Sequence, residues 1–338
     1  MPDALVSNAL RRYGLLEQRP KVVNPLDEWS GVERQLRRLR LKEWLYFTVI
    51  HPELYAAMVI QDAHYLASSE LYAYLPAERI LHQHARTGRG GSLQLPAHLY
   101  GTQTDFRARG YELRYEFGER DSEHRIKLRM AADRHGAELE ASLILHGDRS
   151  SAPLTVSSAL PSSSAGRWSC GAPSMFTHKR AFPVSGNFRV GGRTLSFDPE
   201  RDLVILDEHR SLLPYHTAWT WATFASQGPT GIVGANLVQR AALPNQAGES
   251  CLWSGGGVKP LNGVTFTPPA GKGGVWRVAD SEGRLDLTFT TAGEKLVRRQ
   301  ALVVAINYRQ LFGSFSGLLD GQPVESIHGV IELMQARF

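Results

Sequence analysis

Alternating apolar and polar positions, broken by turn residues, dominate the first half of the chain. Residues 43–50 are aromatic and β-branched, end at the turn His51-Pro52-Glu53, and predict a strand. Further strands are predicted at the following ranges: 54–60, 66–75, 107–117, 123–132 and 137–145. Because almost no helical segment separates them, the pattern predicts an all-β fold. We expect antiparallel β-barrel or β-sandwich domains rather than a parallel α/β sheet.

One segment near the N-terminus has helical rather than strand periodicity. Between residues 4 and 16 the apolar residues recur at helical spacing, as Leu5, Ala9, Leu10, Tyr13 and Leu16. This spacing predicts a short N-terminal helix on the outside of the body.

The second half of the chain repeats the first in outline. A Ser-, Gly- and Pro-rich stretch at 157–172 predicts a loop or linker, followed by strands at 175–180 and 182–190. After it, Trp219-Thr220-Trp221 mirrors Trp44-Leu45-Tyr46. We therefore expect two β domains with their boundary between about residues 150 and 193. The expected division is an arm at 1–20, an N-terminal domain at 21–170 and a C-terminal domain at 171–338.

The stretch 203–224 carries the densest combination of polar and aromatic residues. An apolar strand end at 203–206 runs into Asp207-Glu208-His209-Arg210, which we expect at an edge or rim. After Pro214, alternation places five residues on one strand face: Tyr215, Thr217, Trp219, Trp221 and Thr223. We expect the functional site here.

Each candidate group has a structural alternative. Asp207 beside Arg210 is a candidate general acid or base, with Tyr215 and His209 as candidate proton relays. The alternative is an Arg–Asp pair that only pins a strand end. Trp219 and Trp221 can line a ligand cavity and shield a cation, or simply form core. Further candidate ligand-binding residues are Trp44, Tyr46, His216, Asn236, Glu249 and Lys259.

Composition and missing motifs exclude several function classes. The chain has 338 residues, a formal charge of +5 and no nucleotide-binding glycine motif or nucleophile elbow, which disfavours nucleotide hydrolases, dehydrogenases and serine esterases. The basic run 34–42 lacks interleaved aromatic residues, so we expect no nucleic-acid partner, while an acidic ligand or peripheral membrane contact stays open. Two cysteines, Cys170 and Cys251, and no signal-like start predict a cytoplasmic protein. His82 and His84 lack a third metal ligand, so we expect no metal.

The sequence resembles the bacterial domain-of-unknown-function family numbered 2804 (DUF2804). The similar pieces are residues 41–46, Asp207 with Arg210, Tyr215, Trp219, Trp221, 249–253, 259–266 and 311–317. Where that family tends to show Trp-Gly after the aspartate, this chain has Glu208-His209, so any role for His209 rests on its own chemistry. The family is distantly similar to lipocalin-like carotenoid 1,2-hydratases, AttH-type proteins and calycin-like Diels–Alderases.

This resemblance implies two calycin- or lipocalin-like β domains with a hydrophobic pocket at or near their junction. The resemblance does not specify a reaction. We expect an apolar ligand, terpenoid, polyene or lipid-like, and hydration, isomerisation or cyclisation without a cofactor. We expect Asp207 as the acid, Arg210 as its orienting partner, and Trp219 and Trp221 as the cation-shielding wall. The alternative is a non-catalytic carrier or sensor of hydrophobic ligands. In either case we expect a monomer or homodimer.

Overall fold

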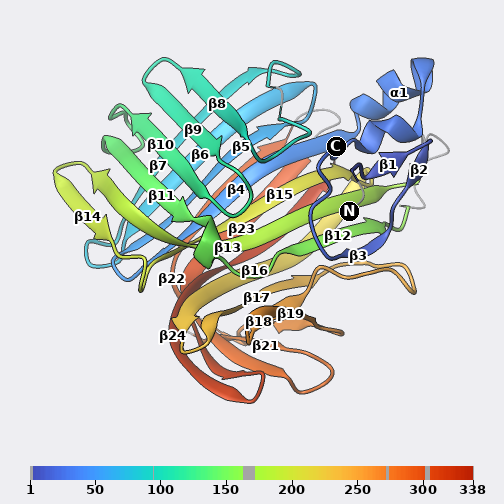
Figure 1. Cartoon of the computed structure of the whole chain (residues 1–338). Helices are drawn as coiled ribbons and strands as arrows, with labels where there is room; N and C mark the ends of the chain where they lie inside the picture. The colour runs from blue at the N-terminus through green and yellow to red at the C-terminus, as the bar shows by residue number, and fades with distance from the viewer. Residues whose placement is uncertain (1–2, 94, 163–171, 272–273, 301–304, 338) are drawn as a thin grey trace.

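Two large antiparallel sheets make up the body of the protein (Figure 1). The computed structural model describes residues 3–93, 95–162, 172–271, 274–300 and 305–337. The prediction of an all-β fold built from two antiparallel sheets is confirmed. Among the helices of these residues, none has the length and apolar character needed to cross a membrane.

The first sheet contains thirteen strands, ten of which follow the order β7-β6-β5-β4-β15-β13-β11-β10-β9-β8. Their bounds are β4 Leu41–His51, β5 Leu54–Asp62, β6 Leu66–Leu75, β7 Ile80–Arg89, β8 Thr102–Ala108, β9 Tyr111–Phe117, β10 Glu123–Met130, β11 Leu139–His146, β13 Ser174–Val190 and β15 Leu203–Leu212. Three strands lie off this path: β3 Gly14–Leu16, β12 Leu154–Ala159 and β14 Arg193–Phe197. The strands predicted at 43–50, 54–60 and 66–75 are confirmed, whereas the one predicted at 107–117 is two strands that meet at a turn.

The second sheet contains nine strands in the order β19-β18-β17-β16-β24-β23-β22-β21-β20. Their bounds are β16 His216–Gly228, β17 Gly231–Gln239, β18 Cys251–Ser254, β19 Gly257–Pro260, β20 Thr265–Thr267, β21 Trp276–Ala279, β22 Leu285–Gln300, β23 Ala305–Leu319 and β24 Gln322–Arg337. Figure 1 shows this sheet curling beneath the first one.

The predicted helix at 4–16 is wrong. These residues form the short strands β1 (Val6–Ser7), β2 (Leu10–Arg11) and β3. Asn8 and Ala9 turn the β1–β2 hairpin at φ 52° and 62°, and β3 pairs with β12, so the segment's hydrogen bonds go to sheet partners rather than to a helix. The α-helix of the described residues, α1 (Gly31–Arg38), follows the 3-10 turn η1 (Pro25–Glu28).

The polar residues Asp207 to Arg210 do not lie at a rim. They sit in the middle of β15, which pairs along its length with β4 and β13 and is buried throughout. The strands predicted at 175–180 and 182–190 are one continuous strand, β13. Among the described residues, the chain passes from the first sheet to the second between β15 and β16, so the division expected at residue 170 falls inside the first sheet. Part of the loop expected at 157–172, residues 163–171, lies outside the described residues.

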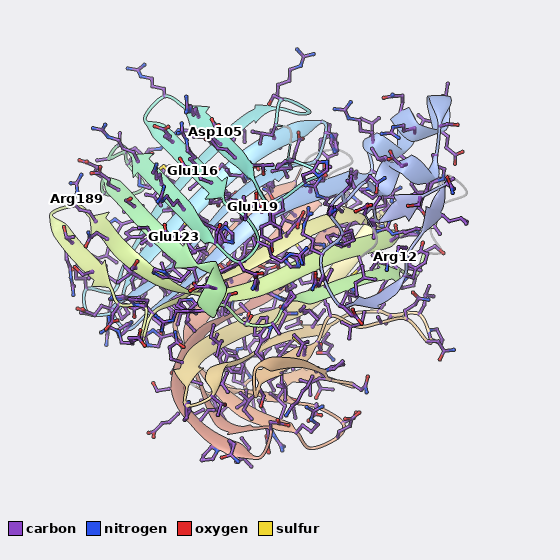
Figure 2. All side chains as sticks on the ribbon, viewed as in Figure 1. Arg12, Asp105, Glu116, Glu119, Glu123 and Arg189 are labelled. Atoms are coloured by element: carbon purple, nitrogen blue, oxygen red, sulfur yellow. The ribbon has the colours of Figure 1, made fainter. Side chains whose placement is uncertain are left out.

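Buried apolar side chains of the described residues form five clusters, of which three define the body of the protein. Each sheet encloses its own core, with Phe47 and Leu206 in the first and Phe289 and Phe315 in the second. A third cluster, which includes Tyr46, Tyr72, Trp221 and Phe312, joins the two sheets. By contrast, the outer face of β8–β11 is charged, as Glu116 and Glu123 illustrate in Figure 2. Charged residues are expected on such an exposed face, whereas charged residues buried between the two sheets are unusual.

Candidate active site at the interface of the two sheets

Two rows of side chains face each other across the interface of the sheets. In the first sheet, strand register aligns the first row: Lys179, Asp207, Tyr46, Val59 and Glu70. In the second sheet, register aligns the second row: Trp221, Glu332, Gln310 and Lys295. Directly opposed residues in neighbouring strands share a face. Each row is therefore a straight line across four or more strands.

Contacts between the rows show that they meet. The Lys179 ammonium lies 5.1 Å from the Trp221 ring centroid, and Gln310 Nε2 donates to the Tyr46 hydroxyl at 2.8 Å. At the far end, Lys295 Nζ pairs with Glu70 Oε2 at 2.6 Å. Asp207 and Glu332 occupy the second position of their respective rows. The interface therefore buries several charged groups among aromatic rings.

Asp207 is paired with a lysine. Lys179 Nζ lies 2.6 Å from Asp207 Oδ2, and Thr177 Oγ1 donates to Oδ1 at 3.4 Å. Lys179 is 1% exposed, and its ammonium also lies 3.5 Å from Glu249 Oε2. A buried charge of this kind is tolerated only when it is paired. Asp207 and Lys179 therefore form one ion-paired unit.

His209 lies in the next position on the same face of β15. Its ring stacks on Trp44 with centroids 4.4 Å apart, and its Nδ1 lies 2.8 Å from Ser211 Oγ. Nε2 is 3.6 Å from Glu249 Oε2. The ring is thus held between the Trp44 indole and the Glu249 carboxylate.

Glu249 links this group to the second sheet. Its Oε1 lies 3.0 Å from Arg240 Nη1, and its backbone carbonyl accepts a 2.6 Å hydrogen bond from Asn236 Nδ2. Asn236 Oδ1 in turn accepts from Trp221 Nε1 at 2.8 Å. Burial alone would raise the pKa of Glu249, but Arg240, then Lys179 and His209, hold that pKa far below its usual value. Glu249 is therefore a fixed anion.

Glu332 is the carboxyl group with the opposite tendency. Burial raises its pKa above 4.5, Asp207 raises it further as a like charge, and hydrogen bonds from Trp219 and Tyr308 oppose the shift. Trp219 Nε1 donates to Oε1 at 2.8 Å, and Gln310 Nε2 is 3.5 Å from Oε2. Glu332 is thus a carboxylic acid that retains its proton more strongly than a free glutamate does. Gln310 Oε1 is buried beside it with no hydrogen-bond partner among the described residues.

The expected partnership of Arg210 with Asp207 is wrong. The two residues are three positions apart in an unbroken strand and therefore project from opposite faces. Arg210 bonds Glu43 at 2.7 Å and Glu208 at 3.1 Å inside the first sheet, and Arg19 holds Glu208 from the other side at 2.6 and 2.7 Å. Arg210 also donates to the carbonyls of Leu95 and Pro96. This cluster pins the N-terminal segment and the 95–97 segment onto β15, which is a structural role.

Three other expected residues lie away from the interface rows. Lys259 is on the edge strand β19, where it pairs with Asp320 at 2.6 Å with a half-exposed side chain. His216 is exposed at the start of β16, and its ring contacts Tyr215. His216 also borders a surface hollow with Arg298 and Arg299. The structure does bring eight expected residues together: Trp44, Tyr46, Asp207, His209, Trp219, Trp221, Asn236 and Glu249.

His82 and His84 instead bind a backbone segment of the β10–β11 connection. His82 Nδ1 accepts from the Ala137 N–H at 3.0 Å, and His84 Nε2 lies 2.9 Å from the Ala137 carbonyl. In the part of the chain that the structure describes, no group of three His, Cys, Asp or Glu side chains is arranged to hold a metal ion.

The sequence reasoning missed Lys179, Glu332, Gln310, Arg240 and Lys295. A signal for one of them exists in the sequence, because Glu332 is the single carboxylate in the apolar run 329–334. A single charged residue in a buried strand needs a buried partner, so it indicates a candidate functional site.

Comparisons with known proteins give one family and a few structures. The chain is similar to kievitone hydratase from Nectria haematococca and to CghA in complex with Sch210972, each at 11% identity, 88% coverage of both chains and a TM-score of 0.49. CghA alone aligns at a TM-score of 0.38. No curated protein matches the sequence. The model of the family "Domain of unknown function (DUF2804)" matches residues 13–338, and the chain therefore belongs to this family.

Proposed function

We propose that the protein is an enzyme that performs acid–base chemistry on an apolar small molecule at the interface rows, without a cofactor. The reaction class is hydration, isomerisation or cyclisation. One observation carries the proposal: Glu332, whose pKa burial raises, and Asp207, which is paired with the Lys179 ammonium, occupy the second position of the two facing rows. A site that holds both an acid and a base needs one carboxyl group that retains its proton and one that can accept a proton.

Glu332 is the proton donor in this proposal. Its pKa is raised by burial, so the neutral acid is available at a higher pH than for a free glutamate. This assignment revises the expectation that Asp207 is the acid. The revision rests on Lys179, whose ammonium 2.6 Å from Asp207 makes that side chain an acceptor rather than a donor.

Asp207 and the aromatic rings stabilise the positive charge that protonation of the substrate creates. Protonating an alkene or a polarised carbonyl leaves a cation, which the ring faces of Trp221 and Tyr46 stabilise. Asp207 supports the same charge and accepts a proton when the cation collapses to product. His209, which stacks on Trp44 and lies 3.6 Å from Glu249, is the proton relay in this proposal.

The side-chain oxygen of Gln310 is a buried acceptor for a water molecule or a substrate hydroxyl. Gln310 Oε1 is fully buried, and Gln310 Nε2 already donates to Tyr46. A donor from water or from a substrate hydroxyl would satisfy Oε1 beside the acid. This feature supports hydration within the proposed reaction class.

The alternative is a carrier that holds the same ligand unchanged. A carrier has no use for a carboxyl group whose proton is retained by burial, which favours the enzyme. The two functions separate in an isotope experiment that needs no knowledge of the product. Apolar molecules extracted from the purified protein are returned to it in D₂O and in H₂¹⁸O and followed by mass spectrometry.

Incorporation of deuterium or ¹⁸O by the native protein supports the enzyme. Glu332→Gln should then reduce the rate by roughly 10²–10⁴-fold, the usual contribution of a general acid. Glu294→Gln is the matched control, because Glu294 pairs with Arg309 at 2.7 Å on the surface. Binding with no isotope incorporation by the native protein would establish the carrier instead.

A further inference from the structure

Helix α1 presents its apolar residues to solvent and one of its three arginines, Arg37, to the protein. Val32, Leu36 and Leu39 are 77%, 51% and 53% exposed, whereas Arg37 is 6% exposed. Arg37 stacks 4.6 Å from the Trp29 ring centroid and pairs with Glu33 at 2.7 Å. At 100° per residue the three apolar side chains fall within an arc of about 60°. This orientation is the reverse of an ordinary surface helix.

The apolar surface of α1 continues onto the turn between β5 and β6. Tyr65 and Leu66 are 44% and 45% exposed there. The Lys42 ammonium joins the two elements, because it donates to the Leu39 carbonyl at 3.0 Å and lies 4.8 Å from the Tyr65 ring centroid. These five residues, Val32, Leu36, Leu39, Tyr65 and Leu66, are called the apolar stripe below.

Positive charge borders the apolar stripe. A hollow of about 500 Å³ lies between α1 and the β6–β7 edge of the first sheet. Arg38 and Arg89, which are both exposed, line it. Residues 31–42 contain five basic residues and one acidic residue, Glu33, which is already paired with Arg37. Exposed apolar side chains flanked by arginines match the chemistry of an anionic lipid surface, which offers acyl chains below a layer of phosphates.

We propose that the apolar stripe and its arginines dock the protein peripherally on membranes that contain anionic phospholipids. The stripe enters the boundary between headgroups and acyl chains, while Arg38 and Arg89 contact lipid phosphates. Figure 1 shows α1 at one end of the molecule, where the chain runs straight into β4. Trp44 and Tyr46 lie on that strand, so a docked membrane would supply apolar molecules next to the interface rows. This delivery step rests on the proposed function; the docking does not.

Vesicle co-sedimentation of the full chain tests the docking. Vesicles of phosphatidylglycerol and phosphatidylcholine should bind the protein at least ten-fold more tightly than vesicles of phosphatidylcholine alone, and added salt should weaken binding. The double variant Arg38→Glu, Arg89→Glu should bind anionic vesicles more weakly than the native protein, by about five-fold or more for each arginine. Leu36→Ser with Leu39→Ser should reduce binding at least ten-fold.

Matched controls separate docking from general stickiness and from self-association. Leu318 is 51% exposed, like Leu36, but lies on the β23–β24 hairpin, so Leu318→Ser should leave vesicle binding unchanged. Glu332→Gln should also bind vesicles normally, which keeps this test independent of catalysis. Absence of binding to anionic vesicles, or equal loss in Leu318→Ser, would overturn the proposal. So would a dimer in sedimentation velocity that dissociates in the Leu36→Ser, Leu39→Ser variant, since the stripe would then be an interface between copies.

Discussion

Trp219 Nε1 donates a 2.8 Å hydrogen bond to Glu332 Oε1 across the neighbouring strands β16 and β24. The indole is half-buried, and the carboxyl group is 9% exposed. This hydrogen bond favours the ionised form of Glu332, while burial and Asp207 favour the neutral form. The balance between these effects sets the pH at which Glu332 gives up its proton.

Replacing Trp219 by Phe should raise the pKa of Glu332 further. The change keeps most of the ring surface but removes the N–H donor that stabilises the carboxylate. The alkaline limb of the pH–rate profile should therefore move to higher pH. Trp221→Phe is the control, because Trp221 donates to Asn236 and not to Glu332. A shift of the same size in both variants would show that the limb belongs to another group.

Glu332 should also leave a mark on stability as a function of pH. Its pKa in the folded protein lies above the ordinary value of 4.5, so its contribution to stability is full below about pH 4.5 and is lost as pH rises through the raised pKa. Thermal melts from acidic to alkaline pH should show this loss in the native protein, and Glu332→Gln should flatten it. If the variant keeps the full slope over that range, Glu332 is not the group responsible.

The Asp207–Lys179 pair should show strong coupling. Asp207→Asn leaves the ammonium of a lysine that is 1% exposed without its closest anion, which should cost about 3–5 kcal/mol in free energy of unfolding. Lys179→Met should cost a similar amount, because it leaves the buried Asp207 carboxylate without its ion-pair partner. The double variant should lose much less than the sum of the two, since no unpaired charge stays buried. Denaturant titrations of all four proteins measure this coupling, and strictly additive losses would refute it.

Arg210 should prove structural. Arg210→Met removes one partner of Glu43 and one partner of Glu208 in the first-sheet interior, at a cost of about 3–5 kcal/mol. Turnover per folded molecule should stay unchanged, because Arg210 projects away from the interface rows. Arg193→Met, which breaks an exposed pair with Glu78 and Glu53, should change stability by no more than about 1 kcal/mol. A drop in turnover without loss of stability would return Arg210 to the active site.

The same cluster should make the protein sensitive to acid. Burial would raise the pKa of Glu208, but Arg19, then Arg210 and His178, hold that pKa at about 2, below its ordinary value of 4.5. The stabilisation is therefore present above about pH 4.5 and is lost as pH falls toward 2. Glu208→Gln should weaken the acid dependence of the unfolding midpoint. A variant that keeps the native acid profile would assign that dependence to other carboxylates.

The sequence by itself determined the β class, most strand positions and the stretch 203–224 in which polar and aromatic residues are concentrated. Alternation and turn chemistry are local, so β4, β5 and β6 follow from their own residues. The same locality explains the error at residues 4–16. Their apolar spacing fits a helix, but pairing of β3 with β12, more than 130 residues away in sequence, supplies hydrogen bonds that no local pattern reveals.

Only the tertiary structure decided which polar residues meet. Once β15 runs unbroken through Asp207 and Arg210, their odd spacing sends them to opposite faces, and a pair that looks adjacent in sequence is separated. The partner of Asp207 comes from β13, and Glu332 comes from the last strand of the second sheet. Strand register aligns each row and sheet packing sets the rows face to face. Both depend on contacts between residues far apart along the chain, which sequence patterns do not encode locally.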